Sequence, residues 1–410
     1  MTSFRQPSSS VTVNGGSGLT WSLSGASIHV HGDWRIRWII FFSIPIHDHG
    51  NFDASATGAS VSVSVTLGKT ATGEPTIRST GCTSHVNRVR IRLHGGASWL
   101  YNLFMGHVER PLRDDLKRKI CEGARKAIDT NGASELATLP VTVPIGDDKQ
   151  WLLDYRLVSS TAFASSYLES FHKGEFFEAE NSTEAPFQPS PLPSPPTTDR
   201  MVTIWVSGHV LNTTGFVLHK QNMLRYYLTK EGLPEKFRKR LNTTCSSMDY
   251  CIGFLFPPVG RKFPDASVEI EMFSSAFPVA RINPQHLIGK FVGVTVFRAR
   301  LSNGSLAHLF TMNVTAEVKV VPRLDGTVLK AKVLSMENTF TVIDSSVGEI
   351  STGVVRLVFN VIKESFIMPK LNETGEKGLL LPTVKHVRFV NSGLQLENEC
   401  VRAFTDVRAI

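Results

Sequence analysis

Apolar and polar residues alternate along many short segments of the chain. Val61, Val63, Val65 and Leu67 alternate with serine and threonine over residues 60–67. The same alternation occurs at residues 88–93, 268–272, 292–296, 317–321 and 327–334. Successive side chains of a strand point to opposite faces, so this pattern predicts antiparallel sheets with one solvated face.

Two longer stretches have the spacing of an amphipathic helix. In the first, apolar residues recur every three or four positions over Trp99–Ile128. Pro111 should kink this helix, because proline removes an internal hydrogen bond. In the second, a similar stripe runs over Val347–Phe366 and ends before Pro369. Each half is therefore predicted to be an antiparallel sheet wrapped around a long amphipathic helix.

A proline-rich segment divides the chain. Six prolines occur in the eleven residues 186–196, which excludes a helix or a central strand and favours an extended spacer. We expect an N-terminal barrel over residues 1–186, a linker over 187–200 and a C-terminal barrel over 201–410. An SH3-type ligand is the alternative, but no basic residue closely flanks the prolines before Arg200.

Composition and charge narrow the class of protein. The 410 residues are 41% apolar and 20% charged, as in globular proteins, and no apolar run is long enough for a transmembrane helix. The net charge is +8. Residues 1–200 hold 19 Lys and Arg against 19 Asp and Glu, so the whole excess lies in 201–410. This excess could serve an anionic partner or solubility alone.

Motifs for catalysis or metal binding are weak. The chain has no Gly-x-Ser-x-Gly or His-Glu-x-x-His motif. Gly68-Lys69-Thr70 resembles the end of a phosphate-binding loop, but Val63 stands where its first glycine belongs. The pairs His29/His31 and His47/His49 could each hold zinc or copper, yet spacing supplies no further ligands. We therefore expect that the protein is not an enzyme and that it holds no cofactor or metal.

Three basic groups could contact phosphates. They are Arg88/Arg90/Arg92, Lys117-Arg118-Lys119 and Lys236-x-Arg238-Lys239-Arg240. A solvated strand or helix face is the simpler explanation for each group. Aromatic residues are sparse around them, so nucleic acid is not an expected partner.

The glycosylation sequons favour a secreted chain. Asn-x-Ser/Thr occurs at six positions, against about three expected by chance. The six predicted glycosylation sites are Asn181, Asn212, Asn242, Asn303, Asn313 and Asn372. Yet no signal peptide follows Met1, so the chain is either intracellular or lacks its true start. Two disulfides are possible, Cys82–Cys121 and Cys245–Cys251. Cys400 would then be unpaired.

Several short segments, in order and spacing, match one known family. They are Gly50–Asp53, Cys82–His85, Trp99–Phe104, Ile120–Glu122, Leu139–Val141, Lys173–Phe176, Asp199–Val202, Asn212–Gly215, Lys262–Pro264, Ser305–Ala307, Pro369–Leu371 and Gly393–Gln395. With the proline linker, they make the chain resemble the family of bactericidal/permeability-increasing protein and lipopolysaccharide-binding protein. The match begins inside the family's mature chain, which would explain the absent signal peptide of a secreted protein.

The resemblance implies an α+β fold: a two-barrel boomerang, each barrel a twisted antiparallel sheet packed on long amphipathic helices, joined by a central sheet. It implies the Cys82–Cys121 disulfide and an apolar pocket for phospholipid in each barrel. The residues expected to line these pockets are Leu100, Leu103, Phe104, Val108, Val354, Val358 and Phe366. Burying acyl chains there would yield about 0.8 kcal/mol per methylene.

The family's lysine-rich tip, which meets lipid A phosphates, is thin in this chain. Only Trp34, Arg35 and Arg37 occupy the corresponding loop, beside Asp33. The resemblance implies a secreted, antimicrobial glycoprotein of innate immunity. Its expected partners are phospholipid, the lipid A of lipopolysaccharide and the bacterial outer membrane surface. The alternative is a phospholipid transfer protein that acts on lipoproteins or membranes without recognising bacteria.

Overall fold

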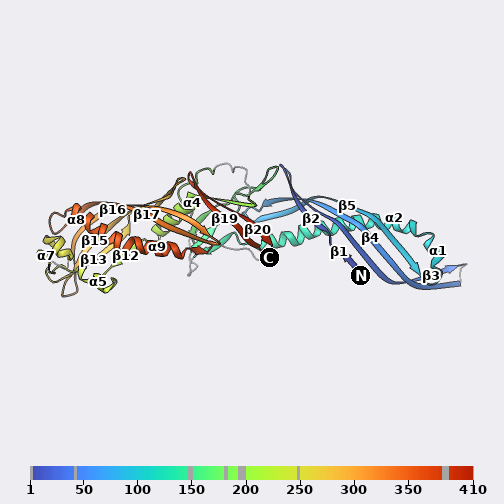
Figure 1. The fold of residues 1–410 in the computed structure, drawn as a ribbon, viewed down its shortest axis with the longest axis horizontal. Helices are drawn as coiled ribbons and strands as arrows, with labels where there is room; N and C mark the ends of the chain where they lie inside the picture. The colour runs from blue at the N-terminus through green and yellow to red at the C-terminus, as the bar shows by residue number, and fades with distance from the viewer. Residues whose placement is uncertain are drawn as a thin grey trace. The chain divides into compact units, whose positions relative to one another are not determined.

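The computed structural model describes residues 3–40, 44–145, 151–179, 183–192, 200–246, 250–380 and 387–409 (Figure 1). The chain divides into two compact units, residues 1–143 with 154–173, and residues 144–153 with 174–410. Residues 183–192 form neither helix nor strand, as expected at the start of the linker, whereas residues 193–199 lie outside the described part. The linker boundaries of 187 and 200 stay a prediction.

The first unit is built on one five-stranded antiparallel sheet. Its strands are β1 (Ser3–Arg5), β2 (Ser8–Asn14), β3 (Gly18–Ile40), β4 (Ile44–Lys69) and β5 (Pro75–His94). Their order is β1-β3-β4-β5, with β2 also paired to β3. The short strands β8 (Ala162–Phe163) and β9 (Leu168–Glu169) form a separate pair. The predicted alternation over residues 60–67 and 88–93 lies in β4 and β5 and is confirmed.

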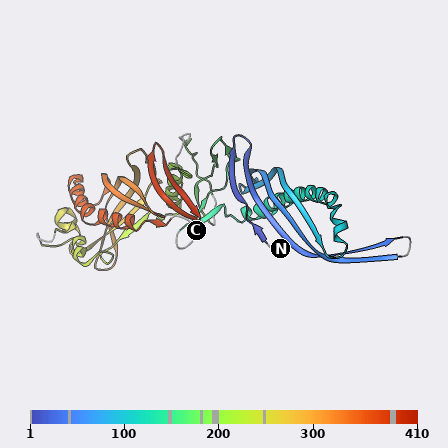
Figure 2. The same cartoon turned by 45° about the vertical axis from the view of Figure 1, so that its right-hand side comes forward.

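The strands β3 and β4 form a long hairpin that extends beyond the end of β5 (Figure 2). Pairing with β5 ends at Asn51 and His94, whereas β3 and β4 stay paired from Arg35 and His49 onward. Within β4, Gly58 has a φ of +64°, and an added Cβ would lie 2.4 Å from the Asn87 side chain. This irregularity shifts the alternation by one residue. Both Ala56 and Val61 therefore lie on the face that carries the helix.

A run of helical segments follows β5. It comprises α1 (Ser98–Asn102), α2 (Met105–Lys126), the π-helical η1 (Ala127–Gly132) and α3 (Ala133–Ala137). The helix α2 continues through Pro111, and the interruption lies at Leu103 and Phe104 instead. Pro111 is in the second turn of α2, where its missing N–H costs only one hydrogen bond near the helix start.

Side chains of these helices contact the outer edge of β5 at successive points. Asn102 accepts a hydrogen bond from the Leu93 N–H at 3.0 Å and donates to the Leu93 carbonyl at 2.9 Å. Glu109 accepts from the Ile91 N–H at 2.9 Å. Nearer the C-terminal end of α2, the Ser84 hydroxyl donates to the Lys117 carbonyl at 2.7 Å. These contacts fix α2 along one edge of the sheet.

The described residues of the second unit form three sheets. A seven-stranded sheet has the order β12-β13-β15-β16-β17-β18, with β14 paired to β15. Its strands are β12 (Arg225–Leu228), β13 (Ser267–Ser274), β14 (Val279–Ile282), β15 (Leu287–Arg300), β16 (Leu306–Asp325), β17 (Val328–Ser345) and β18 (Leu379–Leu380). The smaller sheets are β10-β7-β6 and β11-β20-β19. Their strands are β6 (Thr142–Ile145), β7 (Trp151–Asp154), β10 (Glu175–Glu178), β11 (Val202–Ser207), β19 (Val387–Glu397) and β20 (Cys400–Ala409).

The described part of the second unit also contains helical segments, several of which contribute side chains to its apolar core. They are α4 (Gly208–Lys220), α5 (Glu235–Arg238), the 3-10 helix η2 (Lys239–Leu241), α6 (Ile252–Leu255), α7 (Pro257–Lys262), α8 (Thr352–Ile362), the π-helical η3 (Lys363–Ile367) and α9 (Met368–Lys377). Ser207 and Ser351 cap α4 and α8 through their side chains. The core centres on Phe310, Leu309 and Val268, all fully buried.

The second predicted helix differs from the observed one at both ends. Val347 and Ile350 precede α8 and are buried in the core instead. The helical path does not end before Pro369, because α9 carries Pro369 in its first turn. Proline is tolerated there since the first turn of a helix leaves its N–H groups unpaired, and the preceding π-helical turn already alters the hydrogen-bond pattern.

Candidate functional site

The apolar stripe of the first helical run is open at one end and closed at the other. Leu103 and Phe104 expose 71% and 60% of their surface, and Leu100 and Val108 also lie exposed. At the far end, Ile128 exposes only 9% and packs into a core with β4. None of the 22 residues of α2 is buried. The open end of this stripe therefore offers exposed apolar surface to a ligand.

The closed end is held by a disulfide and by Asp129. Cys82 on β5 is bonded to Cys121 on α2, with a Cα–Cα distance of 5.8 Å. Asp129 accepts hydrogen bonds from the Ser79 N–H and hydroxyl, both at 2.6 Å. These bonds, the side-chain one first, lower the pKa of Asp129. The helix is thus fastened to the sheet where its stripe is covered.

The second stripe divides between the core and solvent. Val354 and Val358 are partly buried, and Val354 packs against the core of the second unit. Phe366 is 39% exposed and contacts Phe237 with ring centroids 6.5 Å apart. More apolar surface is exposed by Val361 and Ile362, which belong to the predicted stripe, and by Leu357, which does not. The exposed apolar face of α8 therefore includes part of the predicted stripe together with Leu357.

The three predicted tip residues lie on strand β3 rather than in a loop. Trp34 exposes only 9% and stacks edge-on against Tyr101 of α1. Its indole N–H donates to the carbonyls of Asn51 and His94 at 3.1 and 3.2 Å. Trp34 is therefore a packing residue on the helix side of the sheet. Arg35 and Arg37 are exposed on the opposite face, so they cannot share one contact surface with Trp34.

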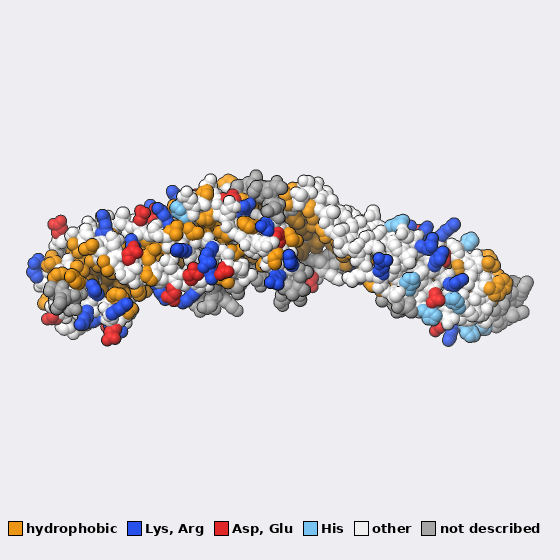
Figure 3. Space-filling model, viewed as in Figure 1, with side chains coloured by type: hydrophobic (Ala, Val, Ile, Leu, Met, Phe, Trp, Pro, Cys, Tyr) orange, Lys and Arg blue, Asp and Glu red, His pale blue; other side chains and the backbone are white. Residues whose placement is uncertain are grey.

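The same opposite face carries most of the arginines and histidines of the sheet. The strand registers place a set of exposed side chains there. We name this set the arginine–histidine face: Arg5, Arg35, Arg37, Arg88, Arg90, Arg92, His29, His31, His47, His49, His85, His94, Asp33 and Asp53. Figure 3 shows blue and pale-blue side chains gathered over β3–β5, in the right-hand part of the view.

Asp53 lies near the middle of this face, between two histidines. Its carboxylate is 2.9 Å from His31 Nδ1 and 3.0 Å from His94 Nε2. The hydrogen bond with His31, followed by that with His94, lowers the pKa of Asp53 against an opposing effect of burial. Both partners of Asp53 come from neighbouring strands. Across the described residues, no group of three or more His, Cys, Asp or Glu has a metal-binding arrangement.

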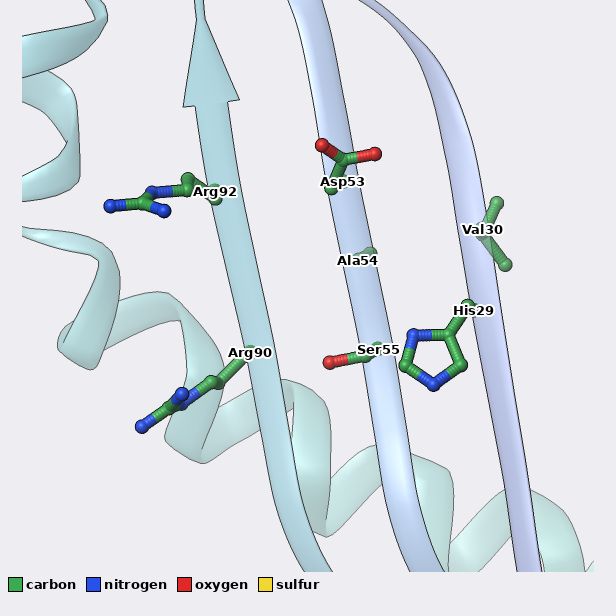
Figure 4. A pocket seen from close by; sticks show the side chains of 7 residues that line it. All are labelled: His29, Val30, Asp53, Ala54, Ser55, Arg90 and Arg92. Carbon is green, nitrogen blue, oxygen red and sulfur yellow. The ribbon is translucent and has the colours of Figure 1, made fainter. Parts of the chain in front are cut away.

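A shallow depression of about 320 Å³ lies on this face beside Asp53 (Figure 4). It is lined by His29, Val30, Asp53, Ala54, Ser55, Arg90 and Arg92. His29 points toward Ser55, whereas Arg90 and Arg92 extend away from Asp53 beyond β5. Within the described part of the chain, neither arginine forms an ion pair, so their guanidinium groups are available to an external anion.

The other basic groups differ in their surroundings. On α2, Lys117 pairs with Asp114 at 2.9 Å, and Lys119 with Glu122 at 3.2 Å. This group is thus a solvated helix face with its charges neutralised locally. Lys236, Lys239 and Arg240 lie exposed in the second unit.

The predicted glycosylation sites are unequally accessible. Asn303 and Asn313 are exposed, whereas Asn212, Asn242 and Asn372 are half-buried. The side chains of Asn212 and Asn372 also accept hydrogen bonds from the N–H groups of Ala280 and Val333. Asn181 lies outside the described residues. Among the remaining cysteines, Cys245 is bonded to Cys251, and Cys400 is a buried thiol.

Comparisons with known proteins match almost the whole chain. The N-terminal domain of the LBP / BPI / CETP family matches residues 1–130, and its C-terminal domain matches residues 147–409. The chain belongs to the LBP / BPI / CETP family. Within this family, it is 28% identical over 403 residues to the bactericidal permeability-increasing protein of Sebastes schlegelii, covering 98% of this chain and 82% of the relative. It is 27% identical over 385 residues to the lipopolysaccharide-binding protein of Homo sapiens, covering 94% and 77%.

A solved structure of the LBP / BPI / CETP type supports the fold. The crystal structure of lipopolysaccharide binding protein matches with a TM-score of 0.58 at 23% identity, covering 99% of this chain and 88% of that one. The predicted α+β fold of this family is confirmed. None of the helices in the described residues is long and apolar enough to cross a membrane.

Proposed function

We propose that this protein is a secreted, non-enzymatic lipid-binding protein of innate immunity, which binds phospholipid and the lipopolysaccharide of Gram-negative bacteria. The uncovered end of the apolar stripe, from α1 to the start of α2, supports this proposal best. Four side chains there, Leu100, Leu103, Phe104 and Val108, expose 40–71% of their surface. An acyl chain lying on them would remove this surface from water, at about 25 cal/mol per Å².

The relatives support the choice of lipid. Two are named for bactericidal, permeability-increasing and lipopolysaccharide-binding activity. In this chain, Arg35 and Arg37 are the cations that the family resemblance assigns to the phosphates of lipid A. Both are exposed on a two-stranded ribbon beyond the end of β5. We assign acyl chains to the helix stripes and phosphates to these arginines.

The experiment compares two assays on the full chain. Radiolabelled lipopolysaccharide binding tests bacterial recognition, and phospholipid transfer between liposomes tests the alternative, a transfer protein acting on lipoproteins or membranes. Lipid extraction and mass spectrometry of the purified protein should find bound phospholipid. Transfer without lipopolysaccharide binding would favour the alternative. If the protein neither binds lipopolysaccharide, nor transfers phospholipid, nor co-purifies with lipid, both proposed functions are contradicted.

A pair of variants tests the stripe itself. Phe104→Asp should lower the amount of co-purifying phospholipid several-fold, because a carboxylate in contact with an acyl chain is strongly unfavourable. The matched control is Val11→Asp, on strand β2, where Val11 is 62% exposed. Equal lipid contents in the two variants would show that the stripe is not the binding surface.

A further inference from the structure

A polar depression in the second unit lies beside one of the predicted glycosylation sites. Its volume is about 420 Å³. Sites for small ligands commonly measure about 300–1,000 Å³. The depression lies where β13 begins and β15 ends, and its lining comes from four segments of the chain. The polar residues that the argument uses are Lys230, Asn242, Thr244, Asp265, Arg300 and Ser302.

The sequon Asn242-Thr243-Thr244 is fixed in place by its two threonines. Thr243 exposes only 1% of its surface, and its hydroxyl donates to the Ala266 carbonyl at 3.0 Å and accepts from the Ala266 N–H at 2.9 Å. The Thr244 hydroxyl accepts from the Asp265 N–H at 2.9 Å. Thr243 is therefore buried, whereas Asn242 and Thr244 line the depression.

The side-chain amide of Asn242 is free to carry a substituent. It forms no hydrogen bond with any residue that the structure describes. The Oδ1 atoms of Asn212 and Asn372, by contrast, accept hydrogen bonds from backbone N–H groups at 2.6 and 2.8 Å. Asn242 is therefore the half-buried sequon whose amide can turn into an adjoining polar space.

The lining of the depression suits a neutral ligand that is rich in hydroxyl groups. Lys230 and Asp265 both line it, yet neither forms an ion pair with the other or with any other described residue. Arg300 pairs with Glu269 and donates to the Gly304 carbonyl, which leaves further N–H donors of its guanidinium. A carboxylate accepts hydrogen bonds from sugar hydroxyls, and an ammonium or guanidinium donates to them. A sugar can thus satisfy both charges without bringing one of its own.

We propose that Asn242 carries an N-linked glycan whose first N-acetylglucosamine residue lies in this depression. Covalent attachment holds the sugar at the rim, so its effective concentration is high and weak hydrogen bonds suffice to dock it. An N-linked glycan is bulky, and the depression supplies the space that it needs beside a half-buried asparagine. The proposal rests on the proposed function only in taking the protein as secreted.

The test uses the full chain, produced through the secretory pathway of cultured animal cells. Mass spectrometry of its peptides should find a glycan on Asn242. Peptide N-glycosidase F is then applied to the folded chain and to the denatured chain. Release from Asn242 should be at least about tenfold slower in the folded chain, because hydrogen bonds to the docked sugar must break first.

A double variant separates docking from general protection by the fold. Lys230→Ala/Asp265→Gly removes two polar partners of the sugar, and glycine suits the φ of +53° at position 265. The control Glu235→Ala/Lys236→Ala removes the same pair of charges from exposed side chains of α5, outside the lining. The first variant should release the Asn242 glycan roughly tenfold faster than the parent, as expected for the loss of one or two net hydrogen bonds. The control should match the parent, and circular dichroism verifies that both variants fold.

Three results would overturn the proposal. The first is an Asn242 peptide without a glycan. The second is a glycan that leaves the folded and the denatured parent at the same rate, which would show that it extends into solvent. The third is equal release from the parent and from Lys230→Ala/Asp265→Gly.

The proposed function can fail separately. The substituted residues belong neither to the helix stripes nor to the arginines assigned to lipid A. Lipopolysaccharide binding and phospholipid content, measured on the same variants, should therefore equal those of the parent. A docked glycan on a protein that binds no lipid would contradict the proposed function and leave the glycan site standing.

Discussion

Removal of the Cys82–Cys121 disulfide should loosen the first unit more than removal of the other bridge loosens the second. The two cysteines are 39 residues apart, whereas Cys245 and Cys251 are 6 apart. Loop-closure entropy predicts losses of about 4 and about 2 kcal/mol. The difference depends only on loop length, and it corresponds to a roughly 15-fold change in an equilibrium constant.

Hydrogen–deuterium exchange with mass spectrometry measures the two losses separately, because peptides from α2 and from the segment around α6 report on different units. We compare Cys82→Ala/Cys121→Ala with Cys245→Ala/Cys251→Ala. Protection of α2 should fall in the first variant and stay unchanged in the second. Losses that are equal, or larger around α6, would refute the reasoning. In that case, the contacts of Asn102, Glu109 and Asp129 would hold the helix without the bridge.

Two further perturbations test how the site is held. Gly50→Ala should destabilise the base of the β3–β4 ribbon by about 1–3 kcal/mol, because the added Cβ would lie 1.9 Å from the His94 carbonyl oxygen. The control Gly81→Ala should be tolerated, because the nearest atom to its added Cβ would be 3.9 Å away. Thermal unfolding compares the stability of the two variants. Asp129→Asn should lower the melting temperature at neutral pH. The pKa of Asp129 is lowered from 3.8 in the folded chain. Its contribution to stability is therefore fully present above the unfolded pKa, and it is lost as the pH falls through the lower pKa of the folded chain. The two melting curves should therefore converge in acid, and a constant difference would contradict the assignment.

The strands were predictable because alternation needs only local information. Val61, Val63 and Val65 are buried on one face of β4, as the sequence indicates. Helix ends were less predictable, because they depend on tertiary packing. Val347 and Ile350 continue the spacing of α8, yet they pack into the core before the helix begins. Pro369 predicts the end of the helix, but a π-helical turn precedes it and α9 begins at Met368, with Pro369 in its first turn.

The arginine–histidine face could not be predicted from the sequence, for a different reason. Arg88, Arg90 and Arg92 alternate with apolar residues, which marks them as one row on a strand. The sequence does not give the partner strands, so it could not place His31 or Arg35 beside that row. Summing charge over residues 1–200 also cancelled cations and anions that the fold puts on different elements. The register of β3, β4 and β5 supplies the missing information.

The side chains along β5 also bear on how the chain behaves in concentrated solution. A strand at the edge of a sheet presents unpaired N–H and C=O groups, which can template a strand from another molecule. Here the Leu93 N–H and C=O are both occupied by Asn102, and the Ile91 N–H by Glu109. At these positions, an incoming strand would have to displace helix side chains before it could pair. The same contacts that position the helix therefore protect this edge from aggregation.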